Sequence, residues 1–193
     1  AILLATIFFS FVLFFSIEKA TFLNIFTSVV SSFSNSGLTS YNPPSNFYLF
    51  FIFLTFFGGS VISNSSGIKF IRLYILFKSS VLEMFKLFSP NIVLDQNILK
   101  TEHKINNENI NSSFLIFICF FISIFLLSSV LSLGGINFEN SFKLSILTIT
   151  NTVNSSLYGL EEIDFSNLLT SSKFFLILFM VIGKIELLSL LLI

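Results

Sequence analysis

Between two apolar runs the chain reads Phe57-Gly58-Gly59-Ser60-Val61-Ile62-Ser63-Asn64-Ser65-Ser66-Gly67-Ile68-Lys69. The glycines and polar residues of this segment interrupt a helix whose flanks are apolar enough for the interior of a lipid bilayer. A backbone that leaves the helix at that depth must face protein or water, because each unpaired amide in hydrocarbon costs several kcal/mol. We therefore expect residues 58–67 to form an intramembrane loop that lines an ion path or a gate.

The composition of the whole chain is that of an integral membrane protein. Hydrophobic residues make up 54% of it and charged residues only 10%. Several apolar runs approach the roughly 20 residues that cross a hydrocarbon core about 30 Å thick. We expect an all-α, multi-pass protein of the plasma membrane that contacts lipid. Both ends fall within apolar runs, so we expect a fragment whose amino-terminal half is missing.

The first half of the chain, residues 1–87, follows the order span, short helix, polar turn and broken span. Residues 1–17 are predicted to be the tail of a membrane span. Residues 21–33 are apolar but too short to cross, which is typical of a re-entrant pore helix. A polar turn at 34–38 ends that helix, and a broken span at 47–87 carries the intramembrane loop.

The second half, residues 113–193, repeats this order, and such a repeat decides the architecture. Its predicted parts are a span at 113–133, a pore helix at 141–150, a polar turn at 153–160 and a truncated last span at 174–193. We therefore predict two tandem units of span, pore helix, filter and span. They would form half of a four-repeat channel-like pore.

Basic residues set the expected orientation. They gather around the segment between the two repeats, at Lys69, Arg72, Lys78, Lys86, Lys100 and Lys104. The positive-inside rule makes the polar linker at 88–112 cytoplasmic. Both polar turns then open to the outside, near an acidic cluster at 161–164. That cluster either concentrates cations or is an ordinary solvated loop.

A polar turn at the end of a short helix has the chemistry of a cation filter. A monovalent ion leaves its hydration shell only when fixed oxygens replace it, and backbone carbonyls at the end of a pore helix do so. Gly37 supplies unusual backbone angles, and the carboxyl end of the helix carries partial negative charge. Because about four such segments ring an ion, two more must come from the missing half or from another chain.

Four motifs occur in order along the chain. They are Phe33-Ser34-Asn35-Ser36-Gly37-Leu38-Thr39, then Gly58-Gly59 with Ser66-Gly67-Ile68-Lys69-Phe70-Ile71-Arg72, then Ser89-Pro90-Asn91-Ile92-Val93, and finally Gly183-Lys184-Ile185-Glu186. On these residues the chain resembles the carboxyl-terminal half of a TrkH-type subunit of the Trk/Ktr/HKT family of potassium transporters. The resemblance implies four repeats around one pore, homodimers, a cytoplasmic nucleotide-binding regulatory protein, and the bacterial inner membrane.

The resemblance also implies roles for single residues. The oxygens that bind potassium would come from Asn35, Ser36 and Gly37 in a third filter and from Ser155 and Ser156 in a fourth. The gate loop would be formed by Gly58, Gly59, Ser63, Asn64, Ser65, Ser66 and Gly67. Lys184 matches a position that is usually Arg and would be a functional charge near that loop.

Lys184 has a plainer reading, in which it pairs with Glu186 or reaches toward the membrane surface. Residues two apart on a helix do not share a face. We therefore expect the partner of Lys184 in the loop or in another repeat.

The fourth filter departs from the family pattern Asn-x-Gly-Pro-Gly-Leu-Gly. The alignment sets Leu157 at the filter glycine, and leucine resists a positive φ. The gate loop also has Ser60, Ile62 and Ser65 in place of glycines. Two readings therefore stay open: potassium uptake, or a subunit of the same fold that passes sodium as well as potassium or does not conduct.

Other classes of function have less support in the residues. An intramembrane enzyme needs acids, bases or metal ligands that converge, yet the single His103 lies in the polar linker and Cys119 is alone in an apolar span. No phosphate-binding glycine loop or nucleic-acid patch is found, so we expect no organic cofactor and no nucleic acid. A secondary transporter of another family would show two broken spans without this order of pore helix and filter.

Overall fold

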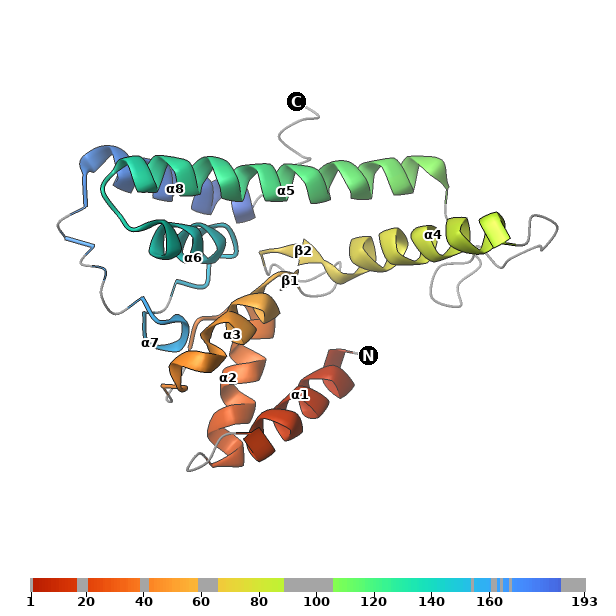
Figure 1. Ribbon diagram of the computed structural model, residues 1–193, viewed down its shortest axis with the longest axis horizontal. Helices are drawn as coiled ribbons and strands as arrows, with labels where there is room; N and C mark the ends of the chain where they lie inside the picture. The colour runs from red at the N-terminus through yellow and green to blue at the C-terminus, as the bar shows by residue number, and fades with distance from the viewer. Residues whose placement is uncertain are drawn as a thin grey trace.

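The computed structural model describes residues 2–16, 21–38, 42–58, 66–88, 106–153, 155–160, 163, 165–166 and 168–184. Its elements are α1 (Ile2–Ser16), α2 (Phe22–Ser34), the 3-10 turn η1 (Ser45–Phe47), α3 (Tyr48–Thr55), β1 (Phe57–Gly58), β2 (Ile68–Lys69), α4 (Phe70–Phe88), α5 (Asn107–Leu133), α6 (Phe138–Ile149), α7 (Ser155–Tyr158) and α8 (Thr170–Lys184). The described chain is mostly helical. Helices α4 and α8 both contact α5, and the shorter helices lie to one side of it (Figure 1).

Helix α2 is amphipathic and packs against α1. Its buried residues are Ile25, Ser28, Val29, Ser31 and Ser32. They recur at the three- and four-residue spacing of one helix face. Thr21 caps the helix by accepting a 3.4 Å hydrogen bond from the backbone N–H of Asn24. The rings of Phe11 and Phe22, 5.1 Å apart between centroids, join α1 to the start of α2.

The predicted broken span consists of two helices with a small parallel ladder between them. Helix α3 ends at Thr55, and β1 then pairs with β2 in the register Phe57 to Ile68 and Gly58 to Lys69. The sequence predicted a helix from residue 68, but α4 begins at Phe70, because the two chain segments that flank the loop pair with each other first. Residues 59–65 lie outside the described residues.

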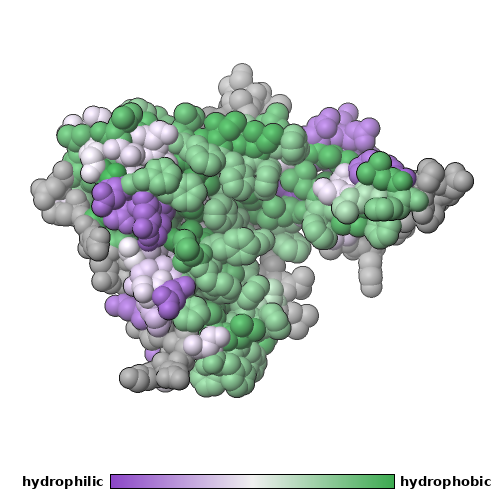
Figure 2. Space-filling model, in the orientation of Figure 1, coloured by the Kyte–Doolittle hydropathy of each residue, from purple (hydrophilic) through white to green (hydrophobic). Residues whose placement is uncertain are grey.

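Helix α5 is the one described helix that is long and apolar enough to cross a membrane. It begins at Asn107, inside the range predicted for the linker, where the extended Asn106 provides the helix start. Its outer face remains exposed and apolar, and the exposed residues include Phe114, Ile122, Phe125, Leu126 and Leu133. The same apolar character covers much of the molecular surface in Figure 2. A surface of this kind suits a lipid environment.

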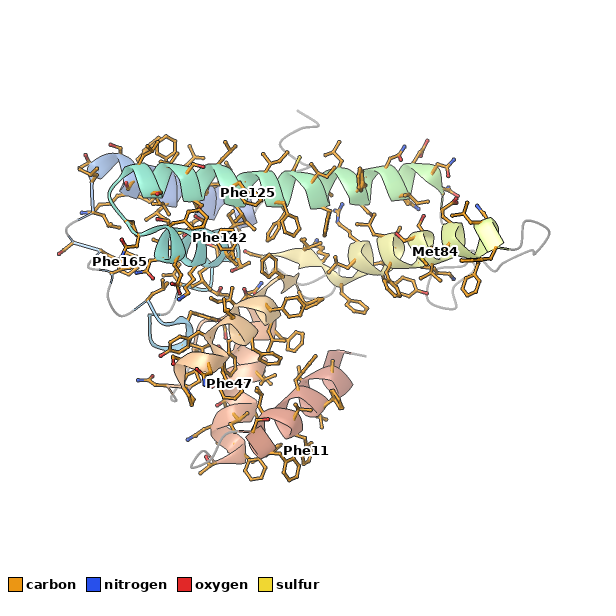
Figure 3. The ribbon with its side chains drawn as sticks, viewed as in Figure 1. Phe11, Phe47, Met84, Phe125, Phe142 and Phe165 are labelled. Atoms are coloured by element: carbon orange, nitrogen blue, oxygen red, sulfur yellow. The ribbon has the colours of Figure 1, made fainter. Side chains whose placement is uncertain are left out.

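Helix α6 is short and is the most deeply buried element of the second half. Every residue from Leu144 to Thr150 is buried. It contacts α5, α8 and α3, and the rings of Phe125 and Phe142 lie 6.1 Å apart between α5 and α6 (Figure 3). A helix of 12 residues whose carboxyl-terminal half is enclosed is a core element and is too short to cross a bilayer.

Helix α8 approaches the end of α6 so closely that only glycine fits at the contact. A Cβ atom on Gly183 would lie 2.1 Å from the carbonyl oxygen of Ile149 and 2.9 Å from its carbonyl carbon. Both of these are backbone atoms, which cannot rotate away. Gly183 therefore sets the distance between the last described helix and the carboxyl end of α6.

We predict that Gly183→Ala lowers the thermal unfolding temperature of the detergent-solubilised full-length protein. The added methyl group forces α8 away from α6, and overpacking of this kind costs about 1–3 kcal/mol. The control is Val181→Ala, which changes an exposed side chain of the same helix. If the two variants unfold at the same temperature, the close approach of α8 and α6 is wrong.

Candidate functional site

The two short helices α2 and α6 end with the same backbone geometry. Asn35 and Asn151 have φ values of 53° and 55°, and they are the non-glycine residues with a positive φ among those described. Asparagine tolerates this left-handed conformation better than most residues. In both cases the asparagine follows its helix directly or after one residue, so each helix is terminated by a left-handed turn.

The hydrogen bonds around the two asparagines also correspond. The N–H of Asn35 donates to the Ser32 carbonyl, and the next N–H, of Ser36, donates to the Ser31 carbonyl. After α6, the N–H groups of Asn151 and Thr152 donate to Thr148 and Leu147 in the same two patterns. Bonds of this spacing define a Schellman motif. The turn at 35–37 therefore corresponds in structure to the turn at 151–153.

Both asparagine side chains reach Ser66, the last polar residue of the predicted gate loop. Asn35 Nδ2 donates to the Ser66 carbonyl oxygen at 2.5 Å, and Asn151 Nδ2 donates to Ser66 Oγ at 2.9 Å. Asn151 Nδ2 also donates to the carbonyl oxygen of Met180 in α8, at 3.0 Å. Ser66 is 6% exposed. We call Asn35, Asn151 and Ser66 the asparagine clamp, because it holds one end of the loop between the ends of two short helices.

Gly67, next to the clamp, is required for two reasons. Its φ is +89°, and a Cβ atom there would lie 3.1 Å from the Thr55 carbonyl oxygen and 3.2 Å from Asn35 Nδ2. Any larger residue would push Asn35 away from its hydrogen bond with Ser66. Gly67 thus lets the returning chain pass beside the end of α3 and the clamp.

The turns after α2 and α6 lie side by side. Gly37 has a φ of +66°, and a Cβ added to it would lie 3.6 Å from the carbonyl carbon and oxygen of Thr152. That is ordinary van der Waals distance for the added atom, so the two backbones are separated by about the width of one methyl group. The turn that the sequence assigned to the third filter is therefore a neighbour of the turn that follows α6.

The described part of the site contains neutral oxygen donors. Hydroxyl pairs lie on each turn, with Ser31 Oγ 3.1 Å from Ser36 Oγ and Thr150 Oγ1 2.7 Å from Thr152 Oγ1. The buried Oδ1 atom of Asn35 has no hydrogen-bond partner among the residues that the structure describes. Among the described residues, no three His, Cys, Asp or Glu side chains gather in a way that would hold a metal ion. Such a donor set suits a weakly coordinated monovalent cation.

The charges of α6 lie at its beginning, away from the turn that follows its end. Lys143 Nζ donates to the Glu139 carboxylate at 2.5 Å. This hydrogen bond, together with the charge of Lys143, lowers the pKa of the exposed Glu139. The carboxyl end of α6 therefore contributes its partial negative charge without an ionised side chain of its own.

The predicted residues of the fourth filter lie in a different conformation from those of the third. Ser155 and Ser156 belong to α7, a single helical turn. Leu157 is buried, and the positive φ expected at its position occurs at Gly159, where φ is +70°. A Cβ on Gly159 would lie 2.4 Å from a ring carbon of Tyr48, so this glycine is also required by packing.

Other predicted site residues are only partly covered by the described structure. Gly58 lies in β1, and Lys184 is the exposed last residue of α8. Lys184 follows, by one helical turn, the residue Met180 whose backbone carbonyl accepts from Asn151. The remaining predicted loop residues, Gly59, Ser63, Asn64 and Ser65, lie outside the described residues, as does Glu186.

Sequence reasoning missed Asn151, Thr152 and Met180. The first two had a signal in the sequence, because the triplet Thr150-Asn151-Thr152 matches Ser34-Asn35-Ser36 in its order of hydroxyl, asparagine and hydroxyl. Each triplet ends a short apolar helix. Met180 contributes a backbone carbonyl, which no side-chain motif reveals.

Comparisons with known proteins agree on one family. The family model described as TrkH, cation transport protein, matches residues 40–193. The Trk system potassium uptake protein TrkG of Escherichia coli (strain K12) is 27% identical over 171 residues, which make up 86% of this chain and 34% of TrkG. The crystal structure of the potassium transporter TrkH from Vibrio parahaemolyticus superposes with a TM-score of 0.85 at 20% identity, covering 98% of this chain and 41% of that chain. This chain thus spans well under half the length of either relative.

We predict that Ser66→Ala couples in thermal unfolding with a substitution of Asn151 and does not couple with a substitution of Asn35. Asn151→Gly keeps the left-handed backbone and removes the amide, which leaves buried acceptors unpaired at a cost of about 1–3 kcal/mol. Its effect should be non-additive with that of Ser66→Ala, because the Ser66 hydroxyl is the partner of Asn151. The effect of Asn35→Gly should add to that of Ser66→Ala, since Asn35 binds the Ser66 backbone.

The control for the clamp cycle is Asn137→Gly, because the exposed Asn137 side chain makes no capping hydrogen bond. Equal coupling of both asparagines to Ser66→Ala, or coupling of neither, would contradict the assigned hydrogen bonds.

A second prediction separates backbone strain from crowding at Gly67. Gly67 and Gly135 have nearly equal φ values, +89° and +90°, but a Cβ on Gly135 would meet nothing within 4 Å. Alanine at either site carries the left-handed cost of about 1–2 kcal/mol. Gly67→Ala should lower the unfolding temperature further than Gly135→Ala does, and equal shifts would show that the space beside Asn35 is open.

Proposed function

Because this chain belongs to the TrkH family of cation transport proteins, we propose that it supplies two of the four filter segments of a potassium uptake protein. The relatives named above are a potassium uptake protein and a potassium transporter. The observation that carries the proposal is that two helix ends with matching turns lie side by side, with Gly37 next to Thr152. Two pore helices that end side by side are what a shared ion path requires.

In this proposal the third filter uses the oxygens of Asn35, Ser36 and Gly37. The fourth filter uses Ser155 and Ser156, as expected from the family pattern, and we add Asn151 and Thr152 because their turn has the geometry of the third filter. Each turn follows the carboxyl end of a short helix, where the partial negative charge favours a cation. The unpaired Oδ1 of Asn35 is a further neutral oxygen within this region.

We propose the loop at 58–67 as the gate beneath the filters. The support comes from its described ends, which are the β1–β2 ladder on one side and the clamp at Ser66 on the other. A loop tied to the filter helices at one end can respond to the state of the filter. Lys184 is assigned to the same region as a positive charge, since its helix also contributes the Met180 carbonyl to Asn151.

The complete pore requires segments beyond this chain. We propose that an amino-terminal half supplies the other two filters, and that the protein works as a homodimer under a cytoplasmic nucleotide-binding regulator. The plasma membrane, the bacterial inner membrane in this family, is its proposed location. The exposed apolar faces of α1 and α5 would then contact lipid or the missing repeats.

A second candidate function is transport that also admits sodium, or a subunit that does not conduct. The observation that favours it is the backbone of the fourth filter, where Ser155 to Tyr158 form a helical turn and Leu157 is buried. A helical turn directs carbonyls along its axis, so residues 155–158 contribute fewer oxygens toward a shared centre. The two candidates differ in the sodium-to-potassium ratio of the ions they carry.

We predict that the full-length natural protein restores growth at limiting potassium in a host that lacks its own potassium uptake. The matched variant is Leu157→Gly, which should grow no better, because the turn takes its positive φ at Gly159 and the glycine leaves a cavity in the core. Rescue by Leu157→Gly alone would identify a subunit that has lost selective transport. Failure of both proteins, with membrane expression confirmed, would contradict potassium uptake.

A further inference from the structure

A fully buried tyrosine connects the two halves of the site. Tyr158 is 0% exposed and belongs to the largest enclosed side chains of the described protein. It ends α7. A buried tyrosine hydroxyl needs a hydrogen-bond partner. The partner of Tyr158 comes from the other half of the chain.

The hydrogen-bond partner of Tyr158 lies in the first half of the chain. Tyr158 Oη is 3.4 Å from Ser32 Oγ, on the buried face of α2. Ser32 and Tyr158 are separated by 126 residues in the sequence. The Tyr158 hydroxyl therefore joins α7, which follows the turn after α6, to α2.

The donor in this hydrogen bond can be assigned from the other hydrogen bond of Ser32. Ser32 Oγ donates its proton to the Ser28 carbonyl at 3.0 Å, so it accepts from Tyr158. Tyr158 therefore donates its single hydroxyl proton to Ser32 Oγ.

The hydrogen bond between Tyr158 and Ser32 lies at the end of α2. Ser32 belongs to the helical turn that leads into Asn35. Helix α7, which carries Tyr158, also contacts α3, where the next residue, Gly159, lies against the ring of Tyr48. The fully buried Tyr158 therefore fixes α7 against α2, next to the turn at 35–37.

We propose that Tyr158 is a positioning residue for cation selectivity. Its ring and hydroxyl fix the separation of the third and fourth filter turns, and so the spacing of the oxygens that replace the water shell of the ion. Selection between potassium and the smaller sodium ion depends on the spacing and field of such oxygens. Loss of the hydrogen bond to Ser32 lets the two turns approach each other, which favours sodium. This inference rests on the proposed potassium uptake.

The test uses rubidium uptake by the full-length protein in membrane vesicles, with sodium as the competitor. Tyr158→Phe removes only the hydroxyl, and Ser32→Ala removes its acceptor on α2. Each change should lower the sodium concentration that halves rubidium uptake by roughly fivefold, the effect of one modest hydrogen bond. The maximal rate without sodium should stay the same. The double variant should be no more sensitive than either single variant.

Tyr48→Phe is the matched control, because it removes a hydroxyl from the neighbouring ring and leaves the hydrogen bond between Tyr158 and Ser32 intact. Natural sodium sensitivity in Tyr158→Phe, or additive effects of the two single changes, would overturn the inference. So would an equal shift in Tyr48→Phe, which would indicate a general loosening.

A separate measurement distinguishes failure of the inference from failure of the proposed function. If the natural protein carries no rubidium, potassium uptake is wrong. In that case the positioning role is tested by the unfolding temperature of the purified full-length protein, measured in potassium and in sodium. The role is supported if potassium raises the unfolding temperature of the natural protein more than sodium does and this difference is absent in Tyr158→Phe. It is overturned if the unfolding temperatures of both proteins are equal in both salts.

Discussion

The hydrogen bonds from Asn35 and Asn151 to Ser66 are the constraint on which the rest of the site depends. They join three segments that are far apart in the sequence, namely the ends of α2 and α6 and the start of the chain that returns through β2. Because all three segments lie among apolar helices, an amide without a partner would be costly there. The left-handed turns at the two asparagines, the glycine at position 67 and the side-by-side placement of the turns at Gly37 and Thr152 all accompany the joining of these segments.

The long helices hold this polar centre in place. Helix α6 packs against α5, α8 and α3, and the turn at its carboxyl end lies beside the turn after α2. Gly183 brings the backbone of α8 against Ile149, close to the Met180 carbonyl that Asn151 binds. Apolar packing of the long helices thus positions the polar groups of the clamp and of the two turns.

The sequence was sufficient for the helical membrane architecture and the break between α3 and α4, because apolar runs and glycine-rich polar turns act locally. It also identified the turn at Asn35, Ser36 and Gly37 by its residue types. It did not identify Asn151, because the family pattern drew attention to the residues after position 153, although the matching hydroxyl, asparagine and hydroxyl triplets were visible. The ladder between β1 and β2 and the hydrogen bond of Tyr158 depend on contacts between distant segments, for which a single sequence carries no periodic signal.

The most direct test of the account is anomalous X-ray diffraction from crystals of the full-length protein in rubidium, which substitutes for potassium and can be located by its scattering. The account predicts a rubidium peak between the turn at 35–37 and the turn at 151–153, within coordination distance of oxygens from both. A peak bound only by residues 155–157, or ordered rubidium elsewhere with none between the two turns, would contradict the assignment of these helix ends to a shared ion path.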